Sequence, residues 1–263
     1  MRALGGALAV WLREFTVFKR ETSRVISAVL QPLMWILLFG GGLGGSVGRG
    51  ASVALPAGID YQQYIFPGIL MMSVLFSSVF YGMYLVWDRK IDVLKAVLVS
   101  PVPRPAIFLG KVLGGCTDVL IQSAILLVVG AVILRLPLGR YALAILPSLG
   151  VILLAAMGTV SIGLTIGSRF ESMEGFQVVG TFVNFPLFFL SGALFPLGAA
   201  LRASQPLLFH LAHADPITYP VDALRGILFG ANLFPMALDL AVMVGFAAVM
   251  VAIGGFAFGR MRL

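Results

Sequence analysis

Long runs of apolar residues, separated by short polar or proline-rich segments, dominate this chain and predict membrane-spanning helices. About 20 apolar residues cross the hydrocarbon layer of a bilayer. Six segments meet this length: residues 25–47, 64–86, 107–134, 141–168, 176–197 and 233–259. An even number of spans places both ends of the chain on the same side of the membrane. We therefore predict an all-α polytopic membrane protein with six transmembrane helices, folded as a single transmembrane domain over residues 1–263.

Residues 1–24 have a different pattern and do not form a span. Their large apolar residues share one face of a helical wheel, and their arginines share the other. The apolar set is Leu4, Leu8, Trp11, Phe15 and Phe18, and the basic set is Arg2, Arg13, Arg20 and Arg24. This pattern is typical of an amphipathic interfacial helix, with its arginines toward anionic headgroups. Docking on a soluble partner is an alternative that is compatible with it.

The longest charged break between two spans is residues 88–111. On a helical wheel, one side carries Ile91, Leu94, Val97 and Leu98, and the other carries Asp88, Asp92 and Lys95. Pro101, Pro103 and Pro105 then prevent the helix from continuing. We predict a short amphipathic helix followed by a proline-braced turn. It is either a solvated loop lying on lipid or a lever through which another protein moves the spans.

The composition and the charge pattern agree with a membrane protein and orient it. The chain is 60% hydrophobic and 11% charged, whereas soluble domains average about 45–50% and about 25%. Of the 18 Lys and Arg residues, 13 lie in the N-terminal segment, the 87–111 loop, Arg169 and the C-terminal tail. Cytoplasmic loops are enriched in Lys and Arg, so we predict that both termini are cytoplasmic. The net charge of +7 is explained in this way and does not indicate a nucleic-acid partner.

The second half of the chain carries several helix-packing and helix-breaking signals. Gly158, Gly163 and Gly167 suit tight helix crossings, and Pro186 predicts a kink in the fifth span. Residues 198–232 are too polar to span and too apolar for a free loop. Asp215-Pro216 and Tyr219-Pro220 are typical of helix starts with proline at the first position, and Asp222 and Arg225 form an i,i+3 pair. We predict re-entrant helices that form a hairpin on the outer face.

The sequence lacks the motifs of several enzyme classes. There is no HExxH and no pair of cysteines, since Cys116 is the only one. His210 and His213 lack a third protein ligand, so we predict neither a metal site nor catalytic residues. Gly110-Lys111 does not complete the GxxxxGK[ST] pattern. We therefore predict that the chain is not itself an enzyme and does not bind ATP through that motif.

Three segments carry a resemblance to a known family: LVSPVPRPAIFLGK at 98–111, LSGALFP at 190–196 and ADPITYPVDALRG at 214–226. With them, essentially the whole chain resembles the membrane subunit, or permease, of type-2 ABC exporters. This group includes daunorubicin-resistance and nodulation-factor export permeases. The resemblance implies a permease of the bacterial or archaeal cytoplasmic membrane, the inner membrane in bacteria with two membranes. Two copies would pair with two copies of an ATPase subunit that holds ATP and Mg, and this chain would hold no cofactor.

The resemblance also implies roles for particular residues. Residues 88–104 would be a coupling helix in a cleft of the ATPase, contacting it through Asp88, Arg89, Asp92, Leu94, Lys95, Leu98, Ser100, Pro101 and Arg104. The outer hairpin would carry a structural motif made of Asp215, Pro216, Tyr219, Asp222 and Arg225. Spans 1, 2 and 5 would line the dimer interface and the path. The candidates there are Gln31, Phe76, Phe80, Asn184, Phe185, Phe188 and Phe189.

The path candidates combine aromatic rings with few charges, which favours an amphipathic substrate over a free ion. Drug-like, lipid-like and lipid-linked glycan substrates all remain open. An ion- or proton-coupled secondary transporter that uses Asp118, an acid within the third span, is an alternative. An intramembrane enzyme is a third hypothesis, but no catalytic groups cluster in the sequence.

Overall fold

The computed structural model describes residues 2–38, 59–136 and 138–261, and these residues form helices joined by short connections, with no strand among them. In chain order the helices are α1 (Arg2–Arg20), α2 (Thr22–Leu37), α4 (Tyr61–Phe80), α5 (Met83–Lys90), α6 (Val93–Val99), α7 (Arg104–Ile133), α8 (Leu138–Gly167), α9 (Met173–Leu190), α10 (Ala199–Ser204), α11 (Pro206–Ala214), α12 (Thr218–Phe229) and α13 (Met236–Gly259). The prediction of an all-α protein is confirmed for this part of the chain.

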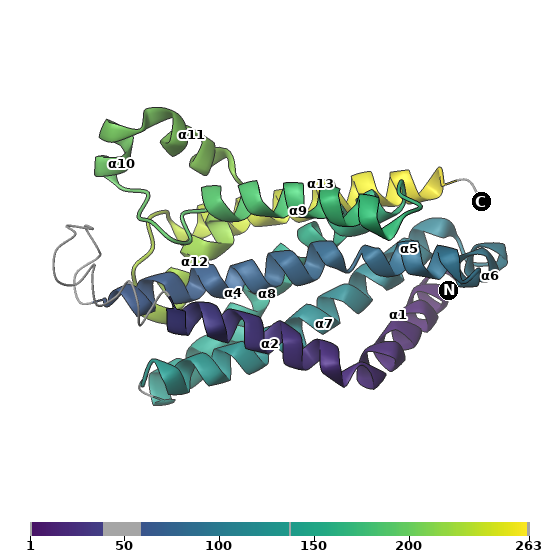
Figure 1. Cartoon of the computed structure of the whole chain (residues 1–263), viewed down its shortest axis with the longest axis horizontal. Helices are drawn as coiled ribbons and strands as arrows, with labels where there is room; N and C mark the ends of the chain where they lie inside the picture. Colours follow the sequence, from purple (N-terminus) through teal and green to yellow (C-terminus); the bar gives the residue numbers. More distant parts are fainter. Residues whose placement is uncertain (1, 39–58, 137, 262–263) are drawn as a thin grey trace.

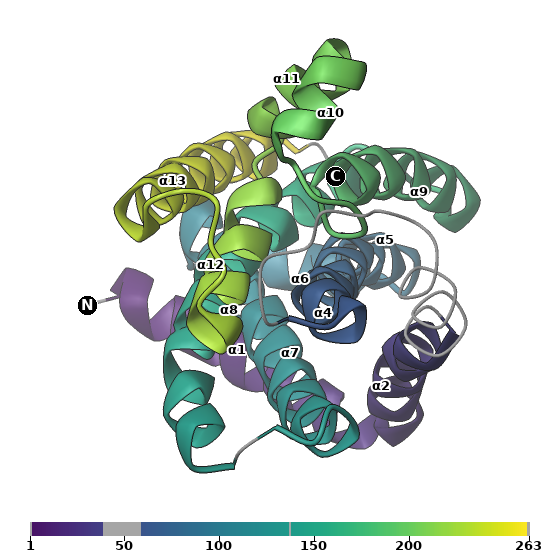
Figure 2. The ribbon, with the colours of Figure 1, turned by 90° about the vertical axis from the view of Figure 1, so that its left-hand side faces the viewer.

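The long helices run side by side in an elongated bundle (Figure 1). Both chain ends lie at one end of the bundle with α5 and α6, and α10 and α11 lie at the opposite end. Seen end-on, α4 has α2, α7, α8 and α9 around it (Figure 2). Its apolar stretch is also the most buried of the span candidates, at 72%. The core of the molecule is therefore built around α4.

Five helical segments in the described part of the chain are long and apolar enough to cross a membrane: Tyr61–Lys90, Arg104–Ile133, Tyr141–Gly167, Met173–Leu190 and Met236–Gly259. They correspond to the second to sixth predicted spans. The first predicted span, residues 25–47, begins within α2, whose 16 residues end at Leu37. Residues 39–47 lie outside the described residues. The total of six spans therefore stays a prediction.

Helix α1 is a separate element, because Glu21 interrupts the helix before α2 begins. It ends at Arg20, four residues earlier than predicted, and it packs along α7. Phe18 is buried, whereas Leu4 is 80% exposed. The predicted apolar face is thus shared between the protein core and the surface.

The segment 88–104 is not one amphipathic helix, and this prediction was wrong. Asp88 belongs to α5, which continues the preceding span to Lys90, and Asp92 adopts a left-handed conformation with φ 58°. Aspartate tolerates this region better than most residues. The turn rotates α6 relative to α5, so that Ile91 is 50% exposed while Leu94 is buried. A wheel drawn across the break therefore places Ile91 on the wrong side.

The outer segment forms three short helices, but the predicted helix starts need correction. Asp215 ends α11 and accepts a hydrogen bond at 2.9 Å on Oδ1 from the Ile217 amide. Helix α12 begins at Thr218, so Pro220 is its third residue instead of its first. The first four amides of a helix have no partner within the helix, and proline is therefore tolerated at this position as well.

The junction of α4 and α5 crosses α8 at backbone contact. A methyl group added at Gly163 would overlap the Val79 carbonyl, and one added at Gly167 or Gly82 would overlap the backbone of the opposite helix. The prediction of tight crossings on α8 is confirmed at these glycines. Since backbones approach this closely only where side chains are absent, the crossing fixes how the second span passes the fourth.

We expect Gly163→Ala to destabilise the protein by about 1–3 kcal/mol, because the added methyl group meets backbone atoms that cannot move aside. The measurement is denaturant-induced unfolding of the purified protein in detergent. Gly150→Ala is the matched control on the same helix, since nothing lies within 4 Å of its added methyl group. Equal stability of the two variants would contradict the close backbone contact between Gly163 and Val79.

Candidate functional site

A cavity of about 890 Å³ opens beside α4, towards the end of the bundle that carries α1 and α5. Its walls come from helices α1, α2, α4, α5, α7 and α9. One part of the wall is apolar and aromatic, with Phe76, Phe80, Met83, Trp87 and Met173. The other part carries polar and charged groups, namely Arg13, Glu14, Glu21, Gln31, Ser77, Asp88 and Gln122. The cavity, which we call the inner pocket, is therefore amphipathic.

A smaller cavity of about 110 Å³ lies between α2, α4 and α9 and shares Gln31 and Phe76 with the inner pocket. Phenylalanines from two helices form its wall. The Phe76 and Phe185 rings meet edge to face with their centroids 5.5 Å apart, and Phe185 stacks on Phe189 at 5.9 Å. Phe188 also lines it. The two cavities together form a groove with aromatic walls along α4.

Of the seven path residues predicted from the sequence, six line this groove: Gln31, Phe76, Phe80, Phe185, Phe188 and Phe189. Asn184 does not line it. Its side chain is fully buried, and neither of its polar atoms has a hydrogen-bond partner among the described residues. The sequence did not single out Trp87 or Met173, because nothing in a local pattern shows which surface of a long apolar helix faces a cavity.

The segment between α5 and α7 presents a mixed surface at the same end of the bundle. Val99 is 78% exposed, and Ile91 and Pro101 are also exposed. Asp92 and Lys95 form an exposed ion pair at 2.7 Å. This surface, defined by Ile91, Asp92, Lys95, Val99 and Pro101, is hereafter the coupling surface.

Other predicted contact residues of this segment face the protein itself. Leu94 is 1% exposed, and Leu98 packs against the core. Arg89 donates hydrogen bonds to the Phe170 and Ser168 carbonyls at 2.8 and 3.0 Å. Arg104 donates to the Gly259 and Met261 carbonyls, and Ser100 donates to the Val97 carbonyl at 2.6 Å. These side chains hold the segment in place.

Asp88 also lies inside the protein, with 6% of its surface exposed. Its carboxylate pairs with Arg13 of α1 and with Lys111 of α7. The helical wheel placed Asp88 on a charged outer face because a wheel shows only neighbours on the same helix. The partners come from positions 75 residues before and 23 residues after it.

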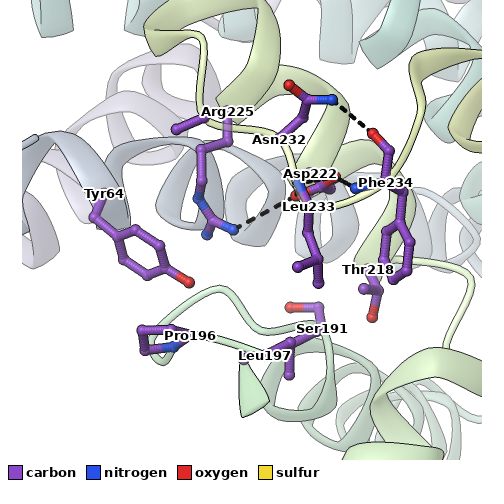
Figure 3. Close-up of a pocket in the computed structure, with 12 residues that line it drawn as sticks. Tyr64, Ser191, Pro196, Leu197, Thr218, Asp222, Arg225, Asn232, Leu233 and Phe234 are labelled. Atoms are coloured by element: carbon purple, nitrogen blue, oxygen red, sulfur yellow. Dashed lines mark hydrogen bonds and ion pairs between the residues drawn. The ribbon is translucent and has the colours of Figure 1, made fainter. Parts of the chain in front are cut away.

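At the opposite end of the bundle, two residues of the predicted outer motif, Asp222 and Arg225, line a cavity of about 260 Å³ (Figure 3). Asp222 accepts hydrogen bonds of 2.8 Å from the Leu233 and Phe234 amides, which fixes the loop before α13. Tyr219 donates to the His213 carbonyl of α11 at 2.8 Å. Burial raises the pKa of Asp222 even though these amides stabilise its charge.

Arg225 connects α12 to the second and fifth spans. Its guanidinium lies 3.9 Å from the centre of the Tyr64 ring of α4, and it donates a hydrogen bond of 3.2 Å to the Gly192 carbonyl. Its distance to Asp222 is 4.0 Å, the outer limit of an ion pair. The sequence predicted a local i,i+3 pair, whereas the principal partners of both residues are distant in the chain.

Comparisons with known proteins cover nearly the whole chain. The sequence profile of a family described as ABC-2 type transporter matches residues 7–229. Nodulation protein J of Rhizobium meliloti (strain 1021) is 26% identical over 245 residues, which cover 92% of this chain and 88% of that protein. The inner membrane transport permease YadH of Escherichia coli (strain K12) is 26% identical over 245 residues, covering 90% and 88%.

The outer motif makes a pH-dependent contribution to stability through Asp215. Burial raises the pKa of this carboxyl to about 7 from an ordinary value of 3.8, and Oδ2 has no hydrogen-bond partner among the described residues. Between these two values the folded state binds more protons than the unfolded state. The free energy of unfolding therefore falls as the pH rises from about 4 to about 7.

We expect Asp215→Asn to remove the decrease in the free energy of unfolding between about pH 4 and about pH 7. The variant should be more stable than the wild type at pH 8 by up to about 4 kcal/mol. The asparagine Oδ1 still accepts from the Ile217 amide, while the unpaired charge is absent. The measurement is the thermal midpoint in detergent from pH 5 to pH 8, with Glu171→Gln in an exposed loop as control. A variant that follows the wild-type pH profile would disprove the assignment.

Proposed function

This chain belongs to the ABC-2 type transporter family, and from this premise we propose that it is the permease of an ATP-driven exporter that moves an amphipathic substrate out of the cytoplasm. Membership makes it a multi-pass transmembrane subunit of an ABC transporter and implies partnership with an ABC ATPase. The observation that carries the proposal is the inner pocket, which combines an aromatic wall with a polar and charged one.

The energy for transport comes, in this proposal, from ATP and Mg held by two copies of a separate ATPase subunit. The sequence of this chain lacks the GxxxxGK[ST] pattern. The coupling surface gives the ATPase a place to bind, since it joins exposed apolar residues to an exposed ion pair at the end of the bundle where both termini lie. The excess of Lys and Arg at this end supports a cytoplasmic orientation.

A second copy of the chain completes the transporter in this proposal. The outward face of α9 is strongly apolar, with Val178 70% and Phe182 79% exposed, and Phe185 and Phe189 about half exposed. The aromatic groove lies beside this face. Two copies that meet through α2 and α9 would enclose the groove between them. The substrate would then pass between the two chains.

The aromatic wall supports a drug-like or lipid-like substrate, and its polar edge supports one that also carries a polar headgroup. The names of the relatives do not identify the substrate of this chain. The alternative of an ion-coupled transporter based on Asp118 is not favoured by the family membership.

We expect Val99→Glu to weaken the binding of the ATPase at least about tenfold, because a buried unpaired charge in an interface costs several kcal/mol. The assay is co-purification with the ATPase encoded beside this chain, followed by ATP-dependent uptake of rhodamine 6G into inside-out vesicles. Leu207→Glu, an exposed leucine at the opposite end of the bundle, is the matched control. Normal co-purification and normal uptake by Val99→Glu would refute this assignment of the coupling surface.

We expect Phe76→Ala to reduce the stimulation of ATP hydrolysis by rhodamine 6G about threefold to tenfold, while the basal rate is retained. Phe76 lines both cavities and contacts Phe185, and a buried aromatic contact contributes about 1 kcal/mol beyond its area. Phe256→Ala on the exposed face of α13 serves as the control. Equal stimulation in the two variants would count against the groove as the path.

A further inference from the structure

Four side chains from helices α1, α5 and α7, and one from the turn between α4 and α5, form a largely buried polar cluster at the inner end of the bundle. Lys111 Nζ lies 2.9 Å from Glu14 Oε1 and 2.6 Å from Asp88 Oδ2. Arg13 donates hydrogen bonds of 2.8 and 3.3 Å to the two oxygens of Asp88. Tyr81, in the turn between α4 and α5, donates one of 2.9 Å to Glu14 Oε2. We call this set the inner cluster.

The inner cluster balances its own charge away from water. Lys111 is 1% exposed, Asp88 6% and Glu14 8%. Two cations face two carboxylates, so the charges balance, and of the four only Arg13 is partly exposed, at 35% of its side chain. Removal of a single member leaves an unpaired charge in a low-dielectric site, which is far more damaging than the removal of a neutral pair.

The inner cluster lies at the base of the segment that carries the coupling surface. Asp88 precedes the left-handed turn at Asp92, and Lys111 follows the start of α7 at Arg104. The 2.6 Å contact between Lys111 Nζ and Asp88 Oδ2 joins the two helices, α5 and α7, that flank the 91–103 segment. Glu14 and Arg13 attach α1 to the same point. A displacement of this segment therefore acts on both α5 and α7 where they meet α1.

Helix α1 also contacts the 91–103 segment directly. A Cβ atom at Gly6 would lie 3.2 Å from Val102 Cβ, and one at Gly110 would lie 2.6 Å from the Ala7 carbonyl oxygen. The two glycines thus let α1 lie close to the proline turn and to α7. Arg13, Glu14 and Asp88 in addition line the inner pocket. The same charged groups therefore face the coupling segment on one side and the pocket on the other.

We propose that the inner cluster is the linkage that makes α1 and the 91–103 segment move as one unit and carries that movement to the wall of the inner pocket. Lys111 is its positioning residue, since it joins α7 to the carboxylates of two other helices, Glu14 of α1 and Asp88 of α5. Arg13 contacts the same two carboxylates, but it belongs to α1 itself and does not reach α7. This inference rests on the proposed function, because it takes the coupling surface to be the place where the ATPase acts.

The first test separates a linkage from a purely structural role. In the double variant Glu14→Gln/Lys111→Met, Arg13 and Asp88 remain as a balanced pair, so the chain is expected to fold and to bind the ATPase. We expect rhodamine 6G uptake per ATP hydrolysed, measured at saturating dye, to fall about tenfold, within the range of coupling between sites. Because Glu14 also lines the inner pocket, the dye concentration for half-maximal uptake is measured as well, and a fall that disappears at saturating dye would overturn the proposal. Lys111→Arg, which keeps the positive charge, keeps the wild-type ratio, and Arg169→Met, at an exposed cation outside the coupling surface, leaves the ratio unchanged.

The second test uses a chain in which the inner cluster is intact. In a Cys116→Ala background, Gly6→Cys and Val102→Cys place two sulfurs within reach of a disulfide. If α1 and the segment move together, oxidation leaves ATP-dependent uptake of rhodamine 6G within about twofold of the reduced protein. Loss of uptake on oxidation, recovered with reductant, would show that they move apart and would overturn the proposal.

An unchanged uptake per ATP in the double variant would overturn the proposal as well. Failure of the proposed function itself gives a different result. In that case the wild-type chain neither co-purifies with the ATPase nor supports ATP-dependent uptake, before any variant is compared. The two failures are therefore distinguished by the wild-type measurement alone.

Discussion

An ammonium group that is shut away from water has to keep its partners within hydrogen-bond reach, and Lys111 imposes this requirement on the inner end of the bundle. Its two carboxylate partners belong to different helices. Lys111 therefore joins α7 to both α1 and α5, and Arg13 adds a second link between α1 and α5. Packing between apolar helices in a membrane provides no comparable directional constraint, because lipid is as apolar as the side chains themselves. The inner pocket lies where the inner cluster meets the aromatic part of α4.

Buried charged side chains also hold the opposite end of the bundle together, but their main partners are not other charged side chains. Asp222 and Arg225 bind mainly backbone groups of neighbouring loops and the face of Tyr64, instead of each other. Between the two ends, α4 meets α8 through glycines and meets α9 through phenylalanine rings. The molecule thus has clusters of charged groups at both ends. The part between them, which borders the groove, is held mainly by packing, with a hydrogen bond of 2.9 Å from Ser77 to Gln122.

The hydrophobic pattern was sufficient to predict the helical class and the positions of five spans, since about 20 apolar residues have no other solution in a bilayer. The resemblance to a permease family, and not the hydrophobic pattern, led to the six residues that line the groove, namely Gln31 of the first predicted span and five phenylalanines of the second and fifth. The hydrophobic pattern could not predict the left-handed turn at Asp92, which depends on how α6 packs. Nor could it pair Asp88 with Arg13 and Lys111, because those contacts are set by the tertiary arrangement.

The hydrogen bonds of Arg104 have a consequence for how the molecule is completed. Its acceptors, the Gly259 and Met261 carbonyls, lie at the end of α13 and just after it, 155 or more residues later in the chain. At about 5–20 residues per second, a nascent chain waits about 10–30 s between making the donor and making the acceptors. The hydrogen bonds that tie the start of α7 to the end of α13 therefore form only after the last span has been synthesised.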